Sequence, residues 1–167
     1  MLVSLQKDLT QAVWAEIAVS YFSQSGFDLI GQSLAALLKR DSRSKFVTML
    51  TCESHAPLQS LYGHAAHPHD QIRFVLSLTQ RAAKDRNDVT LIHGKTAVCV
   101  LPGGQTNEHR VVVYVGSHNF TGPGLGHQGL RNRESSLRLE YRCTGDFRVA
   151  VDPSNAGANH PVVRALE

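Results

Sequence analysis

The chain has 167 residues, of which 42% are hydrophobic and 19% are charged. This length and composition are typical of one globular domain with a substantial core. The formal net charge of +3 agrees with a polyanionic partner without requiring one. No apolar run approaches the roughly 20 residues that a membrane-spanning helix needs. We therefore expect no membrane span and no secretory signal.

The three cysteines are Cys52, Cys99 and Cys143. Their number is odd and no two of them form a C-x-x-C pair, so the pattern indicates neither a disulfide framework nor a zinc ribbon. All three have apolar neighbours in the sequence, which favours buried, reduced thiols. We expect a cytoplasmic protein for this reason.

The first half of the chain alternates β-rich and amphipathic segments. The pattern predicts a central strand at 12–22, a helix at 23–40, a strand at 44–52, a polar loop at about 53–69, and a second amphipathic helix at 69–85. Ser23 or Ser25 is the expected N-cap of the first helix, and Lys39 and Arg40 suit its C-terminal end. Strand, helix, strand, helix is the alternation of an α/β fold.

The second half of the chain is predicted to form mainly β-strands. Two β-rich segments, at 88–102 and 109–120, are separated by "GGQTNE", which predicts a hairpin. Residues 135–143 alternate apolar and charged side chains and predict a half-exposed strand, and 147–151 could form another. We therefore predict an α/β fold with a mixed β-sheet flanked by helices. Residues 1–150 would form one catalytic domain, and 151–167 a tail or linker.

Three short stretches contain residue types that occur in catalytic sites. They are His93-Gly94-Lys95, then "GSHNFT" at 116–121, then "NRE" at 132–134. His93 and Lys95 are two apart in a strand, so their side chains point the same way. The first two stretches end on strands that we expect to pair, which would bring together His93, Lys95, Ser117 and Asn119 at one edge of the sheet. A histidine, a lysine cation and neutral donors together suit attack on a phosphodiester.

This set resembles the phospholipase D superfamily, whose signature is H-x-K followed by G-S-x-N. The resemblance covers roughly residues 12–145 and includes the opening "IAVSYFSQSGFDLI". It implies a phospholipase D-like fold in which His93 is the nucleophile. Lys95, Ser117 and Asn119 would then contact the phosphate.

The chain departs from the superfamily at one position. The usual motif has an aspartate five residues after the lysine, where this sequence has Val100. Branches without that aspartate include tyrosyl-DNA phosphodiesterases and some restriction-type nucleases. Their similarity assigns the carboxylate that orients His93 to Glu134, with Glu140 as the alternative.

The mechanism implied by the resemblance needs a nucleophile on one side of the phosphorus and an acid on the other. The chain has a single H-x-K, so the second histidine would come from another copy in a two-fold homodimer. A phosphohistidine would form and water would resolve it. Lysines and amides would neutralise the phosphate, so we expect no metal and no cofactor.

The leading hypothesis is thus a metal-independent phosphodiesterase, and most specifically a DNA endonuclease, which could be the catalytic domain of a restriction-type or helicase-linked protein. A lipid phosphodiesterase is an alternative within the enzyme class. The alternative from another class is a catalytically inactive module for nucleic-acid binding or dimerisation, which the loss of the aspartate at Val100 favours.

Four other patterns have a possible functional interpretation that the sequence supports less strongly. "GLGHQG" at 124–129 matches a dinucleotide-binding glycine pattern, but no helix follows it. The cluster of Cys52 and nearby histidines fits no strong zinc spacing, and His118 should face away from its neighbours Ser117 and Asn119. Four arginines could line a groove for a phosphate backbone or simply be solvated: Arg131, Arg133, Arg138 and Arg142.

Overall fold

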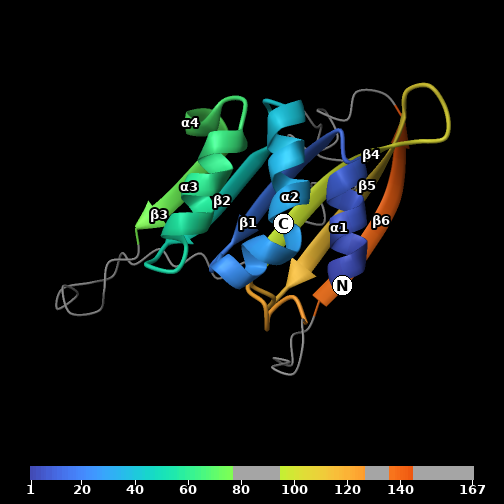
Figure 1. Ribbon diagram of the computed structural model, residues 1–167. Helices are drawn as coiled ribbons and strands as arrows, with labels where there is room; N and C mark the ends of the chain where they lie inside the picture. Colours follow the sequence, from blue (N-terminus) through green and yellow to red (C-terminus); the bar gives the residue numbers. More distant parts are fainter. Residues whose placement is uncertain (77–94, 127–135, 145–167) are drawn as a thin grey trace, which may run out of the picture.

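The computed structural model describes residues 1–76, 95–126 and 136–144. These residues form a six-stranded sheet with helices packed on it (Figure 1). In chain order the elements are α1 (Leu2–Gln11), β1 (Trp14–Val19), α2 (Gln24–Arg40), β2 (Lys45–Leu50), α3 (His55–His64), α4 (Pro68–Gln71), β3 (Ile72–Leu76), β4 (Lys95–Pro102), β5 (Glu108–Gly116) and β6 (Ser136–Thr144).

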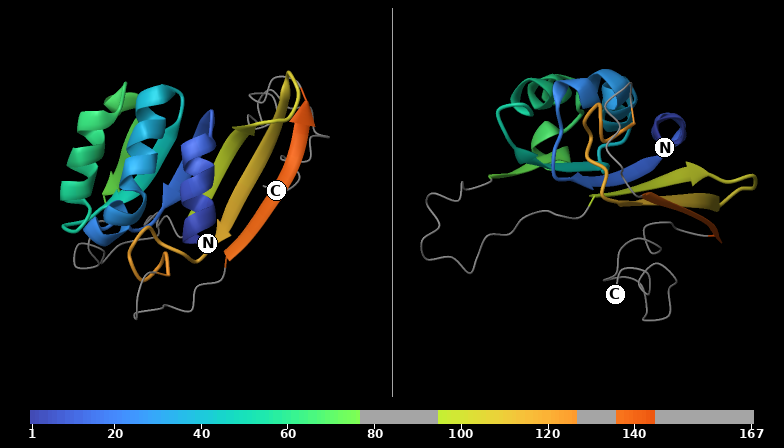
Figure 2. Two further views of the ribbon diagram at one scale, coloured as in Figure 1. Left: turned by 45° about the vertical axis from the view of Figure 1, so that its right-hand side comes forward. Right: turned by 90° about the horizontal axis from the view of Figure 1, so that it is seen from below.

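The sheet is mixed, with the strand order β3-β2-β1-β4-β5-β6. Strands β1, β2 and β3 are mutually parallel, whereas β4 runs antiparallel to β1 and starts an antiparallel run through β5 and β6. The described helices lie on one face of this sheet (Figure 2). The predicted α/β class with a mixed sheet and helical cover is confirmed.

Helix α2 forms where the sequence predicts it. The Ser23 hydroxyl accepts a hydrogen bond from the Gly26 N–H at 3.3 Å, which caps the first turn. Its buried apolar positions recur at helical spacing, so one face of the helix packs on the sheet. Lys39 and Arg40 occupy the last turn, where cations are favoured.

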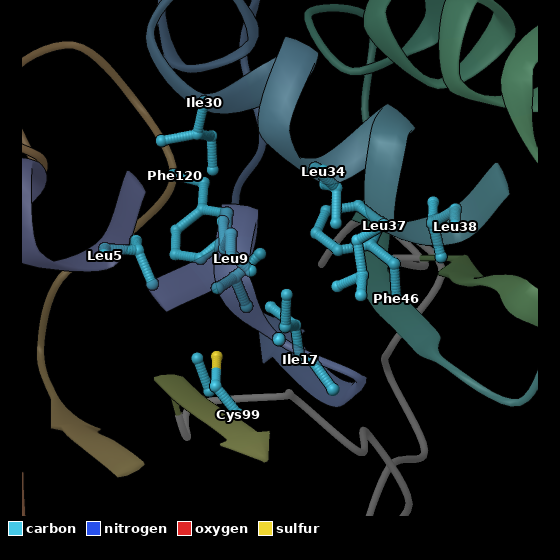
Figure 3. Close-up of a cluster of buried hydrophobic side chains, with 14 of the residues drawn as sticks. Leu5, Leu9, Ile17, Ile30, Leu34, Leu37, Leu38, Phe46, Cys99 and Phe120 are labelled. Atoms are coloured by element: carbon cyan, nitrogen blue, oxygen red, sulfur yellow. The ribbon is translucent and has the colours of Figure 1, made fainter. Parts of the chain in front are cut away.

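The core lies between the helices and the sheet (Figure 3). Ile17 on β1 and Phe46 on β2 are fully buried beneath Leu34 and Leu37 of α2. Burying each such side chain contributes about 2 kcal/mol. The same layer of side chains fixes the position of α2 above the end of β1.

Two predictions in the first half are wrong. Residues 72–76 form strand β3, parallel to β2, and not part of an amphipathic helix. The run "IRFVL" satisfies both helical and strand spacing, and pairing of Phe46 with Ile72 at the edge of the sheet decides between them. The predicted polar loop at 53–69 contains helix α3, whose Leu58 and Leu61 are buried.

Helix α1 precedes the first predicted strand and was not expected. Leu5 and Leu9 are fully buried in the core, and Asp8 between them is 4% exposed. The Asp8 carboxylate accepts hydrogen bonds from the Tyr114 hydroxyl at 2.5 Å and from Arg138 at 3.1 Å. These contacts dock α1 onto β5 and β6.

The predicted hairpin between β4 and β5 is confirmed, as is the strand at β6. The Gly103 N–H donates to the Glu108 carbonyl at 2.7 Å, and Asn107 has a positive φ of 65°, which asparagine tolerates in turns. On β6, Arg138 shares the helix-covered face of the sheet with Tyr114, while Leu137 and Leu139 are 57% and 43% exposed on the other face.

None of the described helices is long and apolar enough to cross a membrane.

Candidate active site

Lys95 is the first residue of β4. It shares the helix-covered face of the sheet with Ala97 and Cys99, which are fully buried, and it is itself only 8% exposed. Its ammonium makes no hydrogen bond and no ion pair to any residue of the described ranges. Lys95 therefore presents at this edge of the sheet a cation that has no partner among the described residues and that could bind an anion.

Strand β5 ends beside Lys95. Gly116 is the register partner of Lys95, and Ser117, His118 and Asn119 follow it directly. Ser117 is exposed and Asn119 is half-buried. The structure therefore places Lys95, Ser117 and Asn119 at one edge of the sheet, as the sequence predicted.

The Asn119 amide is oriented by a residue far away in the chain. Its Oδ1 accepts a hydrogen bond from the Tyr21 N–H at 3.1 Å. Because the oxygen faces that donor, the Asn119 amide NH2 points the other way, and it makes no hydrogen bond within the described part of the chain. Two N–H donors are thus available at the edge where Lys95 lies.

The segment after β5 is locked onto the start of α2. The Gly122 N–H donates to the Ser25 hydroxyl at 3.0 Å, and Phe120 exchanges backbone hydrogen bonds with Tyr21 and Ser23. Gly26 contacts the Phe120 backbone so closely that a Cβ at that position would overlap the carbonyl group. The sequence "SQSG" therefore needs its glycine to hold this segment in place.

The first turn of α2 adds a favourable electrostatic field. The helix follows β1 after a four-residue connection, so its N-terminus lies at the same edge as the C-terminal end of β1. A helix N-terminus carries about half a positive charge and unpaired N–H groups, which attract anions.

Topology identifies the same edge. From β1 the chain continues through α2 to β2 on one side, whereas β4 lies on the other side of β1. Because β4 runs antiparallel to β1, its first residue lies beside the carboxyl end of β1, and open α/β sheets bind ligands at the carboxyl ends of their strands. Lys95 lies on the strand next to β1 there.

His118 faces away from its neighbours, as alternation predicts. It is fully buried, its ring stacks with Phe120 at a centroid distance of 6.5 Å, and its Nδ1 lies 2.7 Å from the Ser136 hydroxyl. This histidine ties the end of β5 to the start of β6.

Two predicted site residues, His93 and Glu134, lie outside the described residues. Glu140, the alternative orienting carboxylate, instead forms ion pairs with Arg138 at 2.8 Å and Arg110 at 3.0 Å. The hydrogen bond from Arg138 lowers the pKa of Glu140 below its usual value. Its register partner is Val112, about 13 Å along the strand from the end where Lys95 lies, so Glu140 is not at the site.

Val100 replaces the usual aspartate at the far end of β4. It is fully buried on the sheet face opposite Lys95 and pairs with Trp14. Five residues of strand separate the two positions by about 17 Å. The missing aspartate therefore removes nothing from the end where Lys95 lies.

The arginines proposed for a phosphate groove divide into two groups. Arg138 is held by Asp8 and Glu140, and Arg142 lies 3.3 Å from Glu108, so both have structural partners. Arg131 and Arg133 lie outside the described ranges. Within those ranges no group of three metal-ligating side chains gathers.

The contribution of "SYFSQSG" at 20–26 to this edge was missed. The sequence resemblance includes this stretch but assigns it no role. The sequence feature that could have revealed this contribution is a strand followed directly by a capped helix with a glycine in its first turn. This pattern places backbone N–H groups at the edge of a sheet.

No family model matches the chain, and neither does any curated protein. Among solved structures, the chain is similar to a crystal structure of polyphosphate kinase from Porphyromonas gingivalis, with 12% identity and a TM-score of 0.43. That match covers 99% of this chain and 22% of the other. The chain therefore spans about a fifth of the protein that it matches.

Proposed function

We propose that this protein is a metal-independent phosphodiesterase, most specifically a DNA endonuclease, with its site at the edge formed by β1, β4 and β5. The observation that carries the proposal is Lys95, a buried cation whose side chain has no partner among the described residues. Asn119 and the N-terminus of α2 add neutral donors and a positive field at the same edge. These groups fit a phosphate.

The proposed reaction runs through His93. Its imidazole nitrogen attacks phosphorus, the bond from phosphorus to the leaving oxygen breaks, and an imidazolium on the opposite side gives its proton to that oxygen. The same second imidazole then takes a proton from water, whose oxygen attacks phosphorus and breaks the P–N bond. Lys95 and Asn119 stabilise the charge on the non-bridging oxygens throughout.

Each chain has one H-x-K, so the second imidazole would be that of a second copy. A two-fold homodimer would present two His93, two Lys95 and two Asn119 to one phosphate. Glu134 would orient His93, as a carboxylate does in hydrolase triads. Light scattering on the active protein tests this arrangement, because a monomer with full activity contradicts a shared site.

The position of Val100 bears on the inactive alternative. The missing aspartate was the reason to consider a binding module without activity, yet its position is buried on the opposite face of the sheet from Lys95. That distance supports the enzyme over the module.

The test is cleavage of plasmid and single-stranded DNA in excess EDTA by the parent protein and by His93→Ala. We expect cleavage by the parent alone. Binding without cleavage by either protein would support the inactive module. Cleavage that requires added magnesium would contradict the mechanism, and hydrolysis of phosphatidylcholine vesicles in place of DNA would favour a lipid phosphodiesterase.

A further inference from the structure

Tyr21 is an exposed aromatic residue at the candidate site. It follows the end of β1 and is 49% exposed, whereas its neighbour Phe22 is 1% exposed and packs against Phe46 at a centroid distance of 5.0 Å. Because adjacent side chains of an extended segment point to opposite sides, burial of Phe22 directs Tyr21 outward.

The backbone of Tyr21 is held firmly. Its N–H donates to Asn119 Oδ1 at 3.1 Å, and its carbonyl accepts from the Phe120 N–H at 3.0 Å. Phe22 and Phe120 form a parallel bridge beside these bonds. The ring of Tyr21 is therefore attached to a fixed point next to the amide that would bind the phosphate.

The pairing of β1 with β4 indicates how far Tyr21 lies from Lys95. Ala18 pairs with Thr96, so Val19 lies opposite Lys95 and Tyr21 is two residues further along. Val19 and Lys95 are one strand spacing apart, and two residues span at most about 7 Å, so the Cα atoms of Tyr21 and Lys95 lie within about 12 Å of each other. One nucleotide could therefore contact both side chains.

Exposure of this ring is unusual in the described part of the chain. Tyr21 and Phe74 are its exposed aromatic residues, while the others are buried or half-buried. Phe74 lies on β3, three strands from β4 and hence about 14 Å from Lys95. Tyr21 is the exposed ring beside the proposed phosphate position.

We propose that Tyr21 stacks on the nucleobase next to the phosphate held by Lys95 and Asn119. This inference rests on the proposed function, because it uses the same anion site. Stacking on an aromatic ring accepts any base, so Tyr21 favours nucleic acid over other phosphodiesters without selecting a sequence. Bases within a duplex have no free face, so the site takes single-stranded or unstacked nucleotides.

The test compares two fluorescent octanucleotides with equal charge, oligothymidylate and the same backbone with base-free deoxyribose at every position. Binding is measured by anisotropy in EDTA for the parent, Tyr21→Ala, Tyr21→Phe and Phe74→Ala. We expect the parent to bind oligothymidylate about tenfold more tightly than Tyr21→Ala does, with little difference on the base-free strand. Tyr21→Phe keeps the ring and Phe74→Ala alters a distant one, so both should bind like the parent.

Two results would overturn the stacking role: unchanged binding of oligothymidylate by Tyr21→Ala, or an equal loss on both strands. Melting temperatures of all four proteins exclude misfolding as the cause of a loss. Hydrolysis of thymidine 5′-(4-nitrophenyl) phosphate, followed in the same samples, separates the two proposals. A base-dependent effect of Tyr21 without hydrolysis supports stacking and contradicts the phosphodiesterase, whereas hydrolysis with no effect of Tyr21 contradicts stacking alone.

Discussion

Asp8 and Lys95 are both buried charged residues, but their surroundings differ. Asp8 is 4% exposed and accepts hydrogen bonds from Tyr114 and Arg138. Lys95 is 8% exposed and has no side-chain partner within the described residues. A charge that serves the fold is paired within it, because leaving it unpaired costs several kcal/mol. The proposed phosphate site therefore rests on Lys95, the buried lysine that has no partner within the described part of the chain.

Of the substitutions, Lys95→Met should have the largest effect. It should lower the catalytic activity without lowering the stability of the fold. Removing one cation that stabilises the transition state should lower kcat/KM for phosphodiesters by about 100- to 1000-fold. The melting temperature should stay the same or rise, because an apolar side chain replaces a buried charge that has no partner among the described residues.

Lys45→Met is the matched control for this change. Lys45 lies on β2 of the same sheet, and its ammonium donates to the Asp70 carbonyl at 2.8 Å. Its activity should equal that of the parent. A large drop in the stability of Lys95→Met, with activity retained, would make Lys95 a structural residue.

Asp8→Asn should show the opposite behaviour. It removes the buried carboxylate that accepts from Tyr114 and Arg138, while Arg138 keeps its ion pair with Glu140, so we expect a loss of about 2 kcal/mol in the free energy of unfolding, measured with urea. Activity well below the melting temperature should persist. Asp28→Asn, on the exposed side of α2, should change stability by less than about 0.5 kcal/mol. Similar losses in the two variants would mean that the Asp8 pairing is unimportant.

Tyr114→Phe tests the neutral member of the same cluster. Loss of its hydrogen bond to Asp8 should cost about 1.5 kcal/mol. Burial, together with that bond, raises the pKa of Tyr114 well above 10. The folded state therefore keeps the proton when the unfolded state loses it, and stability should fall as pH rises above about 10. In Tyr114→Phe the stability should fall less steeply above pH 10. Part of the fall should remain, because burial also raises the pKa of Tyr141, to about 12.

The smallest expected effect is the stabilisation of the protein by inorganic phosphate, and this stabilisation should require Lys95. At a concentration of about five times its Kd, it should stabilise the parent by about 1 kcal/mol. Lys95→Met should show no such shift in melting temperature when chloride keeps the ionic strength equal. Equal stabilisation of both proteins would place the anion elsewhere.

Local patterns predicted the elements that depend on neighbours in sequence. Helix α2 has its cap at Ser23 and its apolar face at helical spacing, and the β4–β5 hairpin has a glycine-rich turn. Strand β3 was assigned wrongly because "IRFVL" fits both periods, and tertiary pairing outweighs weak local preference there. Helix α1 was missed although its buried Leu5 and Leu9 recur at helical spacing.

By itself, the sequence determined that Lys95, Ser117 and Asn119 share one edge of a mixed sheet, because alternation and hairpin pairing are local rules. Only the tertiary structure decided which charged and polar groups meet. Tyr21 orients Asn119 across 98 residues, and Arg138 pairs with Asp8 across 130 residues. Such pairings depend on the packing of α1 and α2 over the sheet, which the spacing of residues along the chain does not specify.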